Sequence, residues 1–417
     1  MPNRSGLEAM VEQPVDRGPF RRCRSARPGV LLAIVVTLLA AGCSDSDTVR
    51  VAKIGVVAPL DAGLVDFGRG IRNSVQLAVD EANERKAVKG WRFEVAAADD
   101  SSDPAKGEAA ALALSTDGAV VGVVGTYNSG VAAKVAPVLK NAGIVMVSPG
   151  NTDPTLTLGA DPAKPARPWD TYFRMVAADN VQGPFLAASA FDDTKARRVA
   201  VVSETKPVSR GLADSFSSAF QAKGGNVVFN RVVPDGTTDF GAVLRAVAPL
   251  RPDLVFFGGE YQVGAEFSKQ AVAARISVPV MGGDGLKDNA YIAAAGPASD
   301  GDLASSVGAP LASLESAGQF LAAYQGAQYA EPPGDFGVYA YDAANVIIAA
   351  ATNALKGVEA IGPAVRGRIV AGVQATDTTG ASGKVAFDRF GDTQNKVLTI
   401  YRVADGAWKP LRTQTVA

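Results

Sequence analysis

The sequence predicts an α/β protein of two lobes, each built on a doubly wound parallel sheet, and three observations lead to this prediction. The chain has 417 residues, more than one typical domain, which leaves enough length for two cores. With 47% apolar and 20% charged residues, the composition is that of a globular protein. Short β-rich runs alternate with helical periodicity in two successive stretches, a pattern typical of parallel sheets covered by helices.

The first alternating stretch begins at Val51. Its β-rich apolar runs predict strands at 51–57, 93–98, 119–124 and 144–147. Apolar residues spaced three to four apart predict helices at 71–82, 104–115 and 131–141. The second of these helices opens with Asp103 and Pro104, an N-cap followed by the proline that suits a first helical position.

The second stretch follows a loop rich in Pro, Asp and Gly at 150–168. Its predicted strands are 198–202, 227–233, 254–257 and 278–281. Its predicted helices are one with Leu212, Phe216, Ala219 and Phe220 on the inner face, then 240–247 and 263–274. Beyond Leu314, two helices at 317–324 and 338–355 precede β-like segments at 384–387 and 397–403. Two such units predict two similar lobes with a cleft between them.

The absence of histidine and the balanced charge narrow the classes of function. With no His, the chain lacks the commonest general acid/base and the commonest metal ligand, so we expect a protein that is not an enzyme, with no metal and no cofactor. A net charge of -1 argues against a nucleic-acid partner. With no imidazole to titrate, we also expect ligand binding to be nearly flat between about pH 6 and 8.

The N-terminus has the layout of an export signal. Arginines from 21 to 27 precede an apolar run at 30–41, which ends in small residues before Cys43. The run reaches about 18 Å as a helix, short of the about 30 Å of a bilayer core. This ending resembles a bacterial lipobox, which implies a lipoprotein signal peptide at 1–42, a lipidated Cys43 and a tether at 43–50. Plain signal cleavage, or a cysteine present there by chance, is the alternative. Because Cys23 leaves with the signal, we expect no disulfide.

Three segments that directly follow predicted strands are candidates for a ligand site, because ligands of such sheets bind beyond the carboxyl ends of strands. Residues 125–130 and 148–152 offer hydroxyls and backbone N–H groups suited to a carboxylate. Residues 282–285 place Asp284 among glycines, where it can pair with an ammonium group. An anion site next to a cation site is what an α-amino acid requires.

Short motifs extend over nearly all of the chain from Val51 to Leu411. They are Ile54-Gly55-Val56-Val57-Ala58-Pro59-Leu60, Phe67-Gly68, 77–83, 99–104, 147–154, Arg174, Gln182-Gly183-Pro184 and Phe257-Gly258-Gly259. Each motif is weak alone, but in their order and spacing the chain resembles the periplasmic branched-chain amino-acid binding proteins of ABC transporters, which have the type I periplasmic binding fold.

The resemblance implies an organisation and a role. Lobe 1 would comprise 51–174 with 307–395, and lobe 2 would comprise 175–306 with 396–417, joined by a hinge. The protein would be an extracytoplasmic, lipid-anchored monomer that delivers a small amino acid, branched-chain or otherwise neutral, to an ABC permease. Two alternatives stay open: a receptor for an amide, a urea-like compound or an aromatic acid, in transport or sensing, and an exported carboxylate-based hydrolase.

The resemblance also implies roles for single residues. Ser129 and Thr152 would hold the ligand carboxylate, the Gly150 carbonyl and Asp284 would hold the ammonium, and Phe67 would cover the ligand. Against these roles, small hydroxyl residues often cap helices and turns, Asp284 can serve a glycine-rich turn, and Phe67 can belong to the core. The family usually has Glu where this chain has Asp284. The expected wall around the ligand side chain also departs from the family and comprises Tyr127, Asn128, Glu260 and Tyr261.

Overall fold

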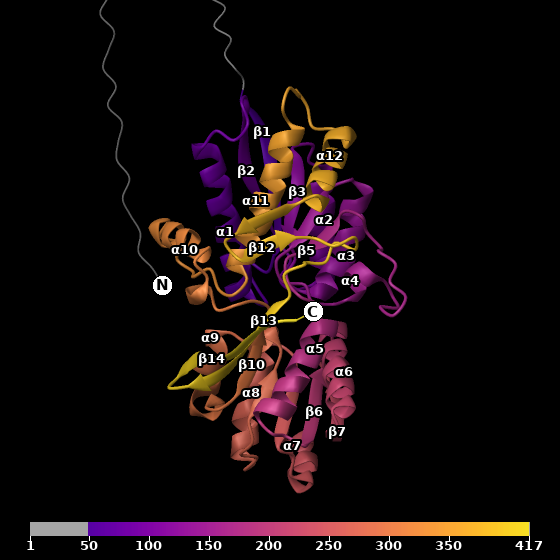
Figure 1. Cartoon of the computed structure of the whole chain (residues 1–417), viewed down its shortest axis with the longest axis vertical. Coiled ribbons are helices and arrows are strands. Elements are labelled where there is room, and N and C mark those ends of the chain that lie inside the picture. Colours follow the sequence, from indigo (N-terminus) through magenta and orange to yellow (C-terminus); the bar gives the residue numbers. More distant parts are fainter. Residues whose placement is uncertain (1–48, 417) are drawn as a thin grey trace, which may run out of the picture. The chain divides into compact units, whose positions relative to one another are not determined.

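The computed structural model describes residues 49–416, in which helices cover two separate sheets (Figure 1). The predicted signal peptide at 1–42, Cys43 and most of the tether at 43–50 lie outside the described residues. Within residues 49–416, no helix combines the length and the apolar character needed to cross a bilayer.

The first sheet is fully parallel, with the strand order β2-β1-β3-β4-β5. Its strands are β1 (Arg50–Ala58), β2 (Trp91–Asp99), β3 (Val120–Gly125), β4 (Val145–Ser148) and β5 (Tyr172–Arg174). The helices around it are α1 (Val65–Glu84), α2 (Pro104–Thr116), α3 (Ser129–Asn141), the single turn α4 (Thr155–Leu158), α11 (Gly337–Ala354) and α12 (Pro363–Gln374). All residues of β3 and β4 are buried, because α2 and α3 pack together on one face and α1, α11 and α12 cover the other.

The second sheet repeats this strand order and adds an antiparallel edge, giving β14-β13-β10-β9-β8-β6-β7. Its strands are β6 (Arg198–Glu204), β7 (Asn226–Val233), β8 (Leu254–Gly258), β9 (Val280–Gly282), β10 (Leu303–Ser306), β13 (Val397–Ala404) and β14 (Ala407–Thr415). The remaining helices are α5 (Asp179–Ala188), α6 (Pro207–Ala222), α7 (Gly241–Val247), α8 (Tyr261–Ala273), α9 (Asn289–Ala295) and α10 (Ala317–Gly326).

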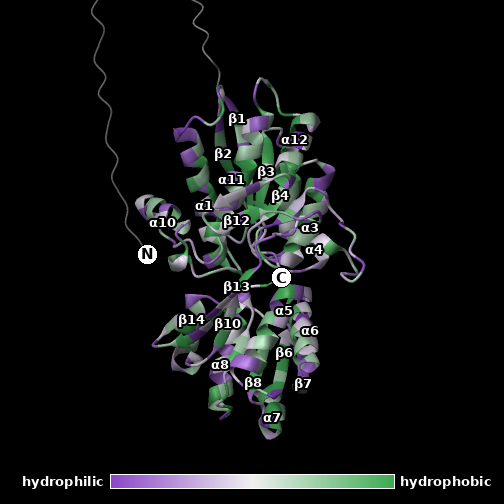
Figure 2. Cartoon of the chain, in the orientation of Figure 1, coloured by the Kyte–Doolittle hydropathy of each residue, from purple (hydrophilic) through white to green (hydrophobic). Residues whose placement is uncertain are grey.

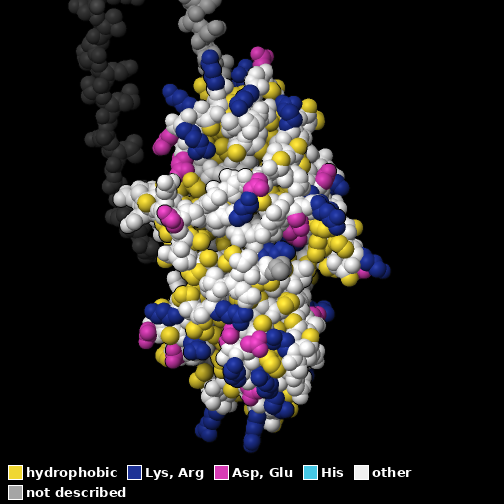
Figure 3. All heavy atoms as spheres, in the orientation of Figure 1, with side chains coloured by type: hydrophobic (Ala, Val, Ile, Leu, Met, Phe, Trp, Pro, Cys, Tyr) yellow, Lys and Arg dark blue, Asp and Glu magenta, His cyan; other side chains and the backbone are white. Residues whose placement is uncertain are grey.

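Shorter elements complete the chain. A π-helical turn at Ser189–Asp193 extends α5, and 3-10 turns lie at Ala248–Leu250, Asp284–Leu286, Gly296–Ser299 and Leu311–Ser313. Strands β11 (Asp377–Gly380) and β12 (Gly383–Ala386) form a separate two-stranded sheet. In Figure 2 the strands of both large sheets are mostly apolar, and polar residues gather on the outer faces of the helices. On the face drawn in Figure 3, acidic and basic side chains are interspersed.

The predicted α/β class and the two doubly wound sheets are confirmed, but several elements were missed. The missed strands are β5, β10, β11 and β14, and the missed helices are α5, α9 and α12. The strand predicted at 278–281 begins two residues later, at Val280, and the loop predicted at 150–168 contains α4. Strand β5 has only three residues, and β10 contains two serines, so neither gives the apolar run on which the prediction relied.

The chain passes between the two sheets three times. It leaves the first sheet after β5, because α5 packs against α6 beside the second sheet. It returns after β10, because α10 and α11 pack against α1. It crosses again between β12 and β13, which pairs with β10. Three connections of this kind are the places where two lobes can move relative to each other.

Strand β14 forms an exposed edge of the second sheet. Its pairing with β13 shifts register between Ile400 and Tyr401, and Pro410 stands opposite Tyr401 at this shift. Lys409, Pro410 and Leu411 are exposed there. A proline has no N–H to donate, so the ladder is interrupted at this point.

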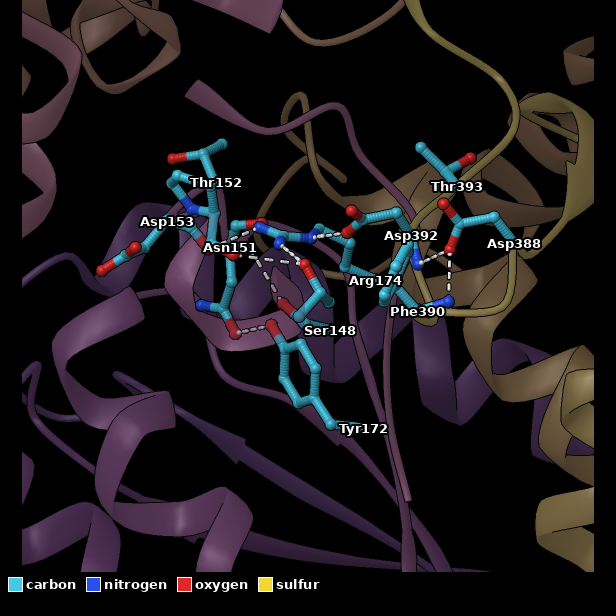
Figure 4. Close-up of polar contacts among 12 residues, drawn as sticks. Ser148, Asn151, Thr152, Asp153, Tyr172, Arg174, Asp388, Phe390, Asp392 and Thr393 are labelled. Carbon is cyan, nitrogen blue, oxygen red and sulfur yellow. Dashed lines mark hydrogen bonds and ion pairs between the residues drawn. The ribbon is translucent and has the colours of Figure 1, made fainter. Parts of the chain in front are cut away.

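Arg174 is fully buried at the end of β5, where the chain first leaves the first sheet (Figure 4). Its Nε donates to Asp392 Oδ1 at 2.5 Å, and its Nη1 donates to the Asp153 carbonyl at 2.8 Å and to the Asn151 carbonyl at 3.3 Å. Its Nη2 donates to the Thr157 hydroxyl. Burial acts to lower the pKa of Arg174, but Asp392, Tyr172 and Asp153 together outweigh it, so the pKa lies above its ordinary value. One guanidinium thus joins β5, the loop after β4 and the turn that precedes β13.

We expect Arg174→Met to lower the free energy of unfolding by about 3–5 kcal/mol, because the change leaves buried acceptors and Asp392 without a partner. Urea unfolding followed by circular dichroism measures this loss. The exposed Arg245→Ala on α7 is the control and should change stability by less than about 0.5 kcal/mol. A loss no larger than that of the control would contradict the role of Arg174.

Candidate functional site

A cavity of about 50 Å³ lies where loops from the carboxyl ends of both sheets meet. One water needs about 10–15 Å³, so the cavity holds a few waters or a small solute. Its lining residues are Tyr127, Asn128, Ser129, Gly150, Thr152, Val208, Ser209, Leu212, Gly259, Glu260, Gly283, Asp284 and Gly285. They follow strands β3, β4, β6, β8 and β9. In each sheet the cavity therefore lies at the point where the strand order reverses, which is the usual ligand position in such folds.

Seven of the nine predicted site residues line this cavity, and Phe67 and Tyr261 do not. Phe67 is buried with its ring centroid 4.6 Å from that of Tyr127, 5.1 Å from Phe336 and 5.5 Å from Tyr261. The Tyr261 hydroxyl donates to Asp66 Oδ2 at 3.0 Å. Phe67 was expected to cover the ligand, whereas here it belongs to an aromatic cluster that supports Tyr127, the member that reaches the cavity.

Ser129 begins α3 and connects the two loops of the first sheet that reach the cavity. Its Oγ accepts from the backbone N–H of Thr152 at 3.2 Å and of Asp153 at 3.3 Å. With two donors on this oxygen, the hydroxyl proton is free to be donated elsewhere. No side chain caps the first turn of α3. The start of the helix therefore presents hydrogen-bond donors and the positive end of its dipole.

The position of Thr152 is set from both sides. Arg174 holds the carbonyls of Asn151 and Asp153, the residues before and after it (Figure 4). Asn151 also donates to the Tyr127 carbonyl at 2.7 Å, and its Oδ1 accepts from the Tyr172 hydroxyl at 2.9 Å. The loops after β3 and β4 therefore form one rigid wall, although Arg174 itself does not line the cavity.

Asp284 lines the opposite wall, directly after β9 and Gly283, and is 8% exposed. Gln182 Nε2 donates to Asp284 Oδ1 at 3.0 Å, and Gln182 Oε1 accepts from the Asp284 N–H at 2.9 Å and from the Ser305 hydroxyl at 2.6 Å. Burial raises the pKa of Asp284 to about 6. Asp284 therefore changes its charge near pH 6, the lower limit of the range of about pH 6 to 8 over which ligand binding is expected to be nearly flat. That expectation stays a prediction.

A second carboxyl group, Asp179, lies behind Asp284 in the same network. Gln182 Nε2 also approaches Asp179 Oδ1 at 3.2 Å, while Asp179 Oδ2 is buried and has no partner among the described residues. Burial, with the nearby charge of Asp284, raises the pKa of Asp179 well above its ordinary value. The sequence pointed to Gln182 only as part of a motif and did not point to Asp179 as a site residue, because this network depends on packing between α5 and the loop after β9.

The third part of the cavity wall is a chain of polar contacts that starts at Asn128. Its Nδ2 donates to Glu260 Oε1 at 2.7 Å, and Lys206 Nζ pairs with Glu260 Oε2 at 2.5 Å. Glu204, whose side chain is fully buried at the end of β6, lies 3.9 Å from Lys206 and accepts from the N–H groups of Gly236 and Glu260. Burial raises the pKa of Glu204. Lys206 and Glu204 were missed, although Glu204 follows the same strand-end rule as Asp284.

Further contacts join the two sides of the cleft near the cavity. Gln262 Nε2 donates to the Gly63 carbonyl at 3.2 Å. Lys287 and Asp335 form an ion pair at 2.7 Å. Together with the bonds from Asn128 to Glu260 and from Tyr261 to Asp66, they show that the loops of the two sheets are in direct contact in this structure.

The fold and this cleft define a class, the two-lobed α/β proteins that enclose a small solute between their sheets. Residues 51–407 match the family described as periplasmic binding protein, and the chain belongs to that family. The predicted family, fold and solute-binding role are thereby confirmed. Proteins of this family act outside the cytoplasm.

Individual relatives agree with this assignment. The chain is 30% identical to the Leu/Ile/Val-binding protein BraC3 of Rhizobium johnstonii, over 84% of this chain and 90% of that protein. A leucine-binding protein, LivK, of Thermotoga maritima superposes with a TM-score of 0.77 at 25% identity, over 87% of this chain and 99% of that one. The branched-chain amino acid transporter substrate-binding protein LivJ of Streptococcus pneumoniae, in complex with isoleucine, gives 0.77 at 26% identity, over 88% and 99%.

We expect Asp284→Asn to raise the free energy of unfolding of the empty protein at pH 7 by about 1 kcal/mol. The pKa of Asp284 is raised from 3.8 to about 6 in the folded chain, so folding disfavours the charged form, and the cost grows as pH rises from about 4 to about 6 and then levels off. Below about pH 4 the difference between variant and parent should vanish. Urea unfolding at both pH values measures this, with the exposed Asp300→Asn as control. An equal difference at both values would contradict the assignment.

Proposed function

We propose that this protein is an extracytoplasmic receptor that binds a small α-amino acid in the cleft and delivers it to an ABC permease. The observation that carries the proposal is the polarity of the cavity. The uncapped start of α3 and the Ser129 hydroxyl lie on one side, and the Asp284 carboxylate lies on the other. The relatives named as Leu/Ile/Val-binding proteins, and the isoleucine complex of LivJ, support an amino acid as the solute.

The proposed carboxylate site comprises Ser129, Thr152 and the first N–H groups of α3. Helix N-termini favour anions because unpaired N–H groups and the helix dipole act together. The Ser129 oxygen already accepts two backbone bonds, so its proton can be directed at the ligand. Thr152 lines the cavity beside it, with 5% of its surface exposed.

The proposed ammonium site pairs Asp284 with the carbonyl of Gly150. Gly150 lines the cavity next to Tyr127, and a Cβ at this position would lie 3.0 Å from the Tyr127 ring. A larger residue would therefore push the ring toward the ligand or move the carbonyl. An ammonium group would pair with the charged form of Asp284 and so offset the cost of its burial.

Closure of the lobes follows from the position of the two sites. The carboxylate site belongs to the proposed lobe 1, 51–174 with 307–395, and Asp284 belongs to the proposed lobe 2, 175–306 with 396–417. Only a closed cleft pairs both charges of a zwitterion, so the ligand shifts the equilibrium toward closure about the three crossings. The proposed activity is binding and release, with no catalytic step.

The proposal includes a membrane anchor and a partner. The signal peptide at 1–42 would be removed, Cys43 would carry the lipid, and residues 43–50 would connect the lipid to β1. A closed, loaded monomer would then dock on the membrane subunits of an ABC transporter.

We expect calorimetry of the purified protein to show amino-acid binding tighter than about 1 mM. Ser129→Ala and Asp284→Asn should each weaken it about tenfold or more, because each removes a hydrogen bond to a charged group. The exposed Ser313→Ala is the control and should leave the affinity unchanged. Binding of an amide or organic acid without any amino acid, or unchanged affinity in both site variants, would contradict the proposed site.

We expect Cys43→Ser to move the protein from the membrane fraction to the soluble fraction of expressing bacteria, because a thiol at this position is needed for the lipid. Cys23→Ser should leave the distribution unchanged, since Cys23 lies within the predicted signal peptide. Fractionation and mass spectrometry of the N-terminus measure both effects. A parent protein that is soluble, or that begins at a residue other than Cys43, would contradict the anchor.

A further inference from the structure

One buried acceptor in the cavity wall has no partner. Asn128 lines the cavity, and its Oδ1 is buried without a hydrogen bond among residues 49–416. The other end of the same amide is occupied, because Nδ2 donates to Glu260 Oε1 at 2.7 Å across the cleft. Buried polar atoms are nearly always paired, so an unpaired acceptor on a residue that lines a ligand cavity points to a donor on the ligand.

The orientation of this amide is fixed by its surroundings. Turning the amide would place its oxygen against the Glu260 carboxylate, and both atoms would then be acceptors. Glu260 is itself held by Lys206 on its second oxygen at 2.5 Å. In the closed cleft, the unpaired atom of the Asn128 amide is therefore the acceptor Oδ1 and not the donor Nδ2.

The charges around Asn128 disfavour ionised ligand side chains, an anionic one most strongly. Glu260 and Glu204 lie on this side of the cavity, so an anionic side chain would meet like charge. A cationic side chain would gain less from this side, because Lys206 already pairs with Glu260 and repels a second cation. A purely aliphatic side chain would leave Asn128 Oδ1 unpaired when the cleft closes, and unpaired buried acceptors weaken binding.

We propose that the solute is an α-amino acid whose small, uncharged side chain donates a hydrogen bond to Asn128 Oδ1, as an amide or a hydroxyl does. This inference rests on the proposed function and narrows it. It sets the chain apart from BraC3, which is named for leucine, isoleucine and valine, because the side chains of those three solutes offer no donor.

Calorimetry with amino acids matched in shape tests the proposal on the purified protein. Threonine should bind about tenfold or more tightly than valine, and asparagine about tenfold or more tightly than leucine, the factor expected for one unpaired buried acceptor. Equal or tighter binding of valine and leucine would overturn this inference while leaving the proposed function intact. Failure of every amino acid in the panel, including glycine and alanine, would overturn both.

The variant Asn128→Leu tests the residue itself. We expect it to abolish or reverse the preference for threonine over valine and for asparagine over leucine. Its side chain makes no capping bond to α3, so the helix start should survive the change, and circular dichroism with thermal unfolding checks the fold. The matched control is Asn230→Leu on the exposed edge strand β7, which should keep the preference of the parent. A preference that is the same in Asn128→Leu and the parent would overturn the assignment.

Discussion

The buried guanidinium of Arg174 is the interaction on which the site depends. It lies at the point where the chain leaves the first sheet, and it binds the loop after β4 and the turn before β13. A charge with no exposed surface is tolerated only with a partner and a full set of acceptors, and here the partner comes from a segment 218 residues away. The first and third crossings between the sheets are thereby joined. The loop that carries Thr152, in the proposed carboxylate site, is held in place because Arg174 bonds to the carbonyls on either side of that residue.

Several acidic groups are buried around the cleft, and burial of their charged forms lowers the stability of the fold. Asp284, Asp179 and Glu204 are buried around it, and burial raises the pKa of each. Among residues 49–416, Glu204 alone of these three forms an ion pair, with Lys206 at 3.9 Å. Unfavourable charge of this kind is typical of functional sites, where a ligand supplies the missing partner. Under the proposed function, the ammonium group of the ligand would offset part of the cost of burying these carboxyl groups.

Much of the fold was predictable because its strands are apolar and its helices keep a regular spacing. The position of Ser129, Thr152 and Asp284 after strands placed them near one edge, and the structure brings them to one cavity. What could not be predicted depends on contacts between distant segments. The pairing of Asn128 with Glu260 spans 132 residues, and Phe67 packs against Tyr127 and Phe336 and does not line the cavity. The local sequence pattern predicts where a residue lies along its strand or helix. It does not predict which residue of the other lobe its side chain contacts.

The interrupted edge strand at Pro410 affects the tendency of the protein to aggregate through its sheet edges. A regular edge strand is a template on which a second chain can add its own strand, and repeated addition leads to fibrous aggregates. In β14 the proline removes a donor where the register shifts, and the flanking Lys409 adds charge that a neighbouring strand would have to desolvate. The β14 edge of the second sheet is thus a poor template for the addition of a strand from another copy of the protein.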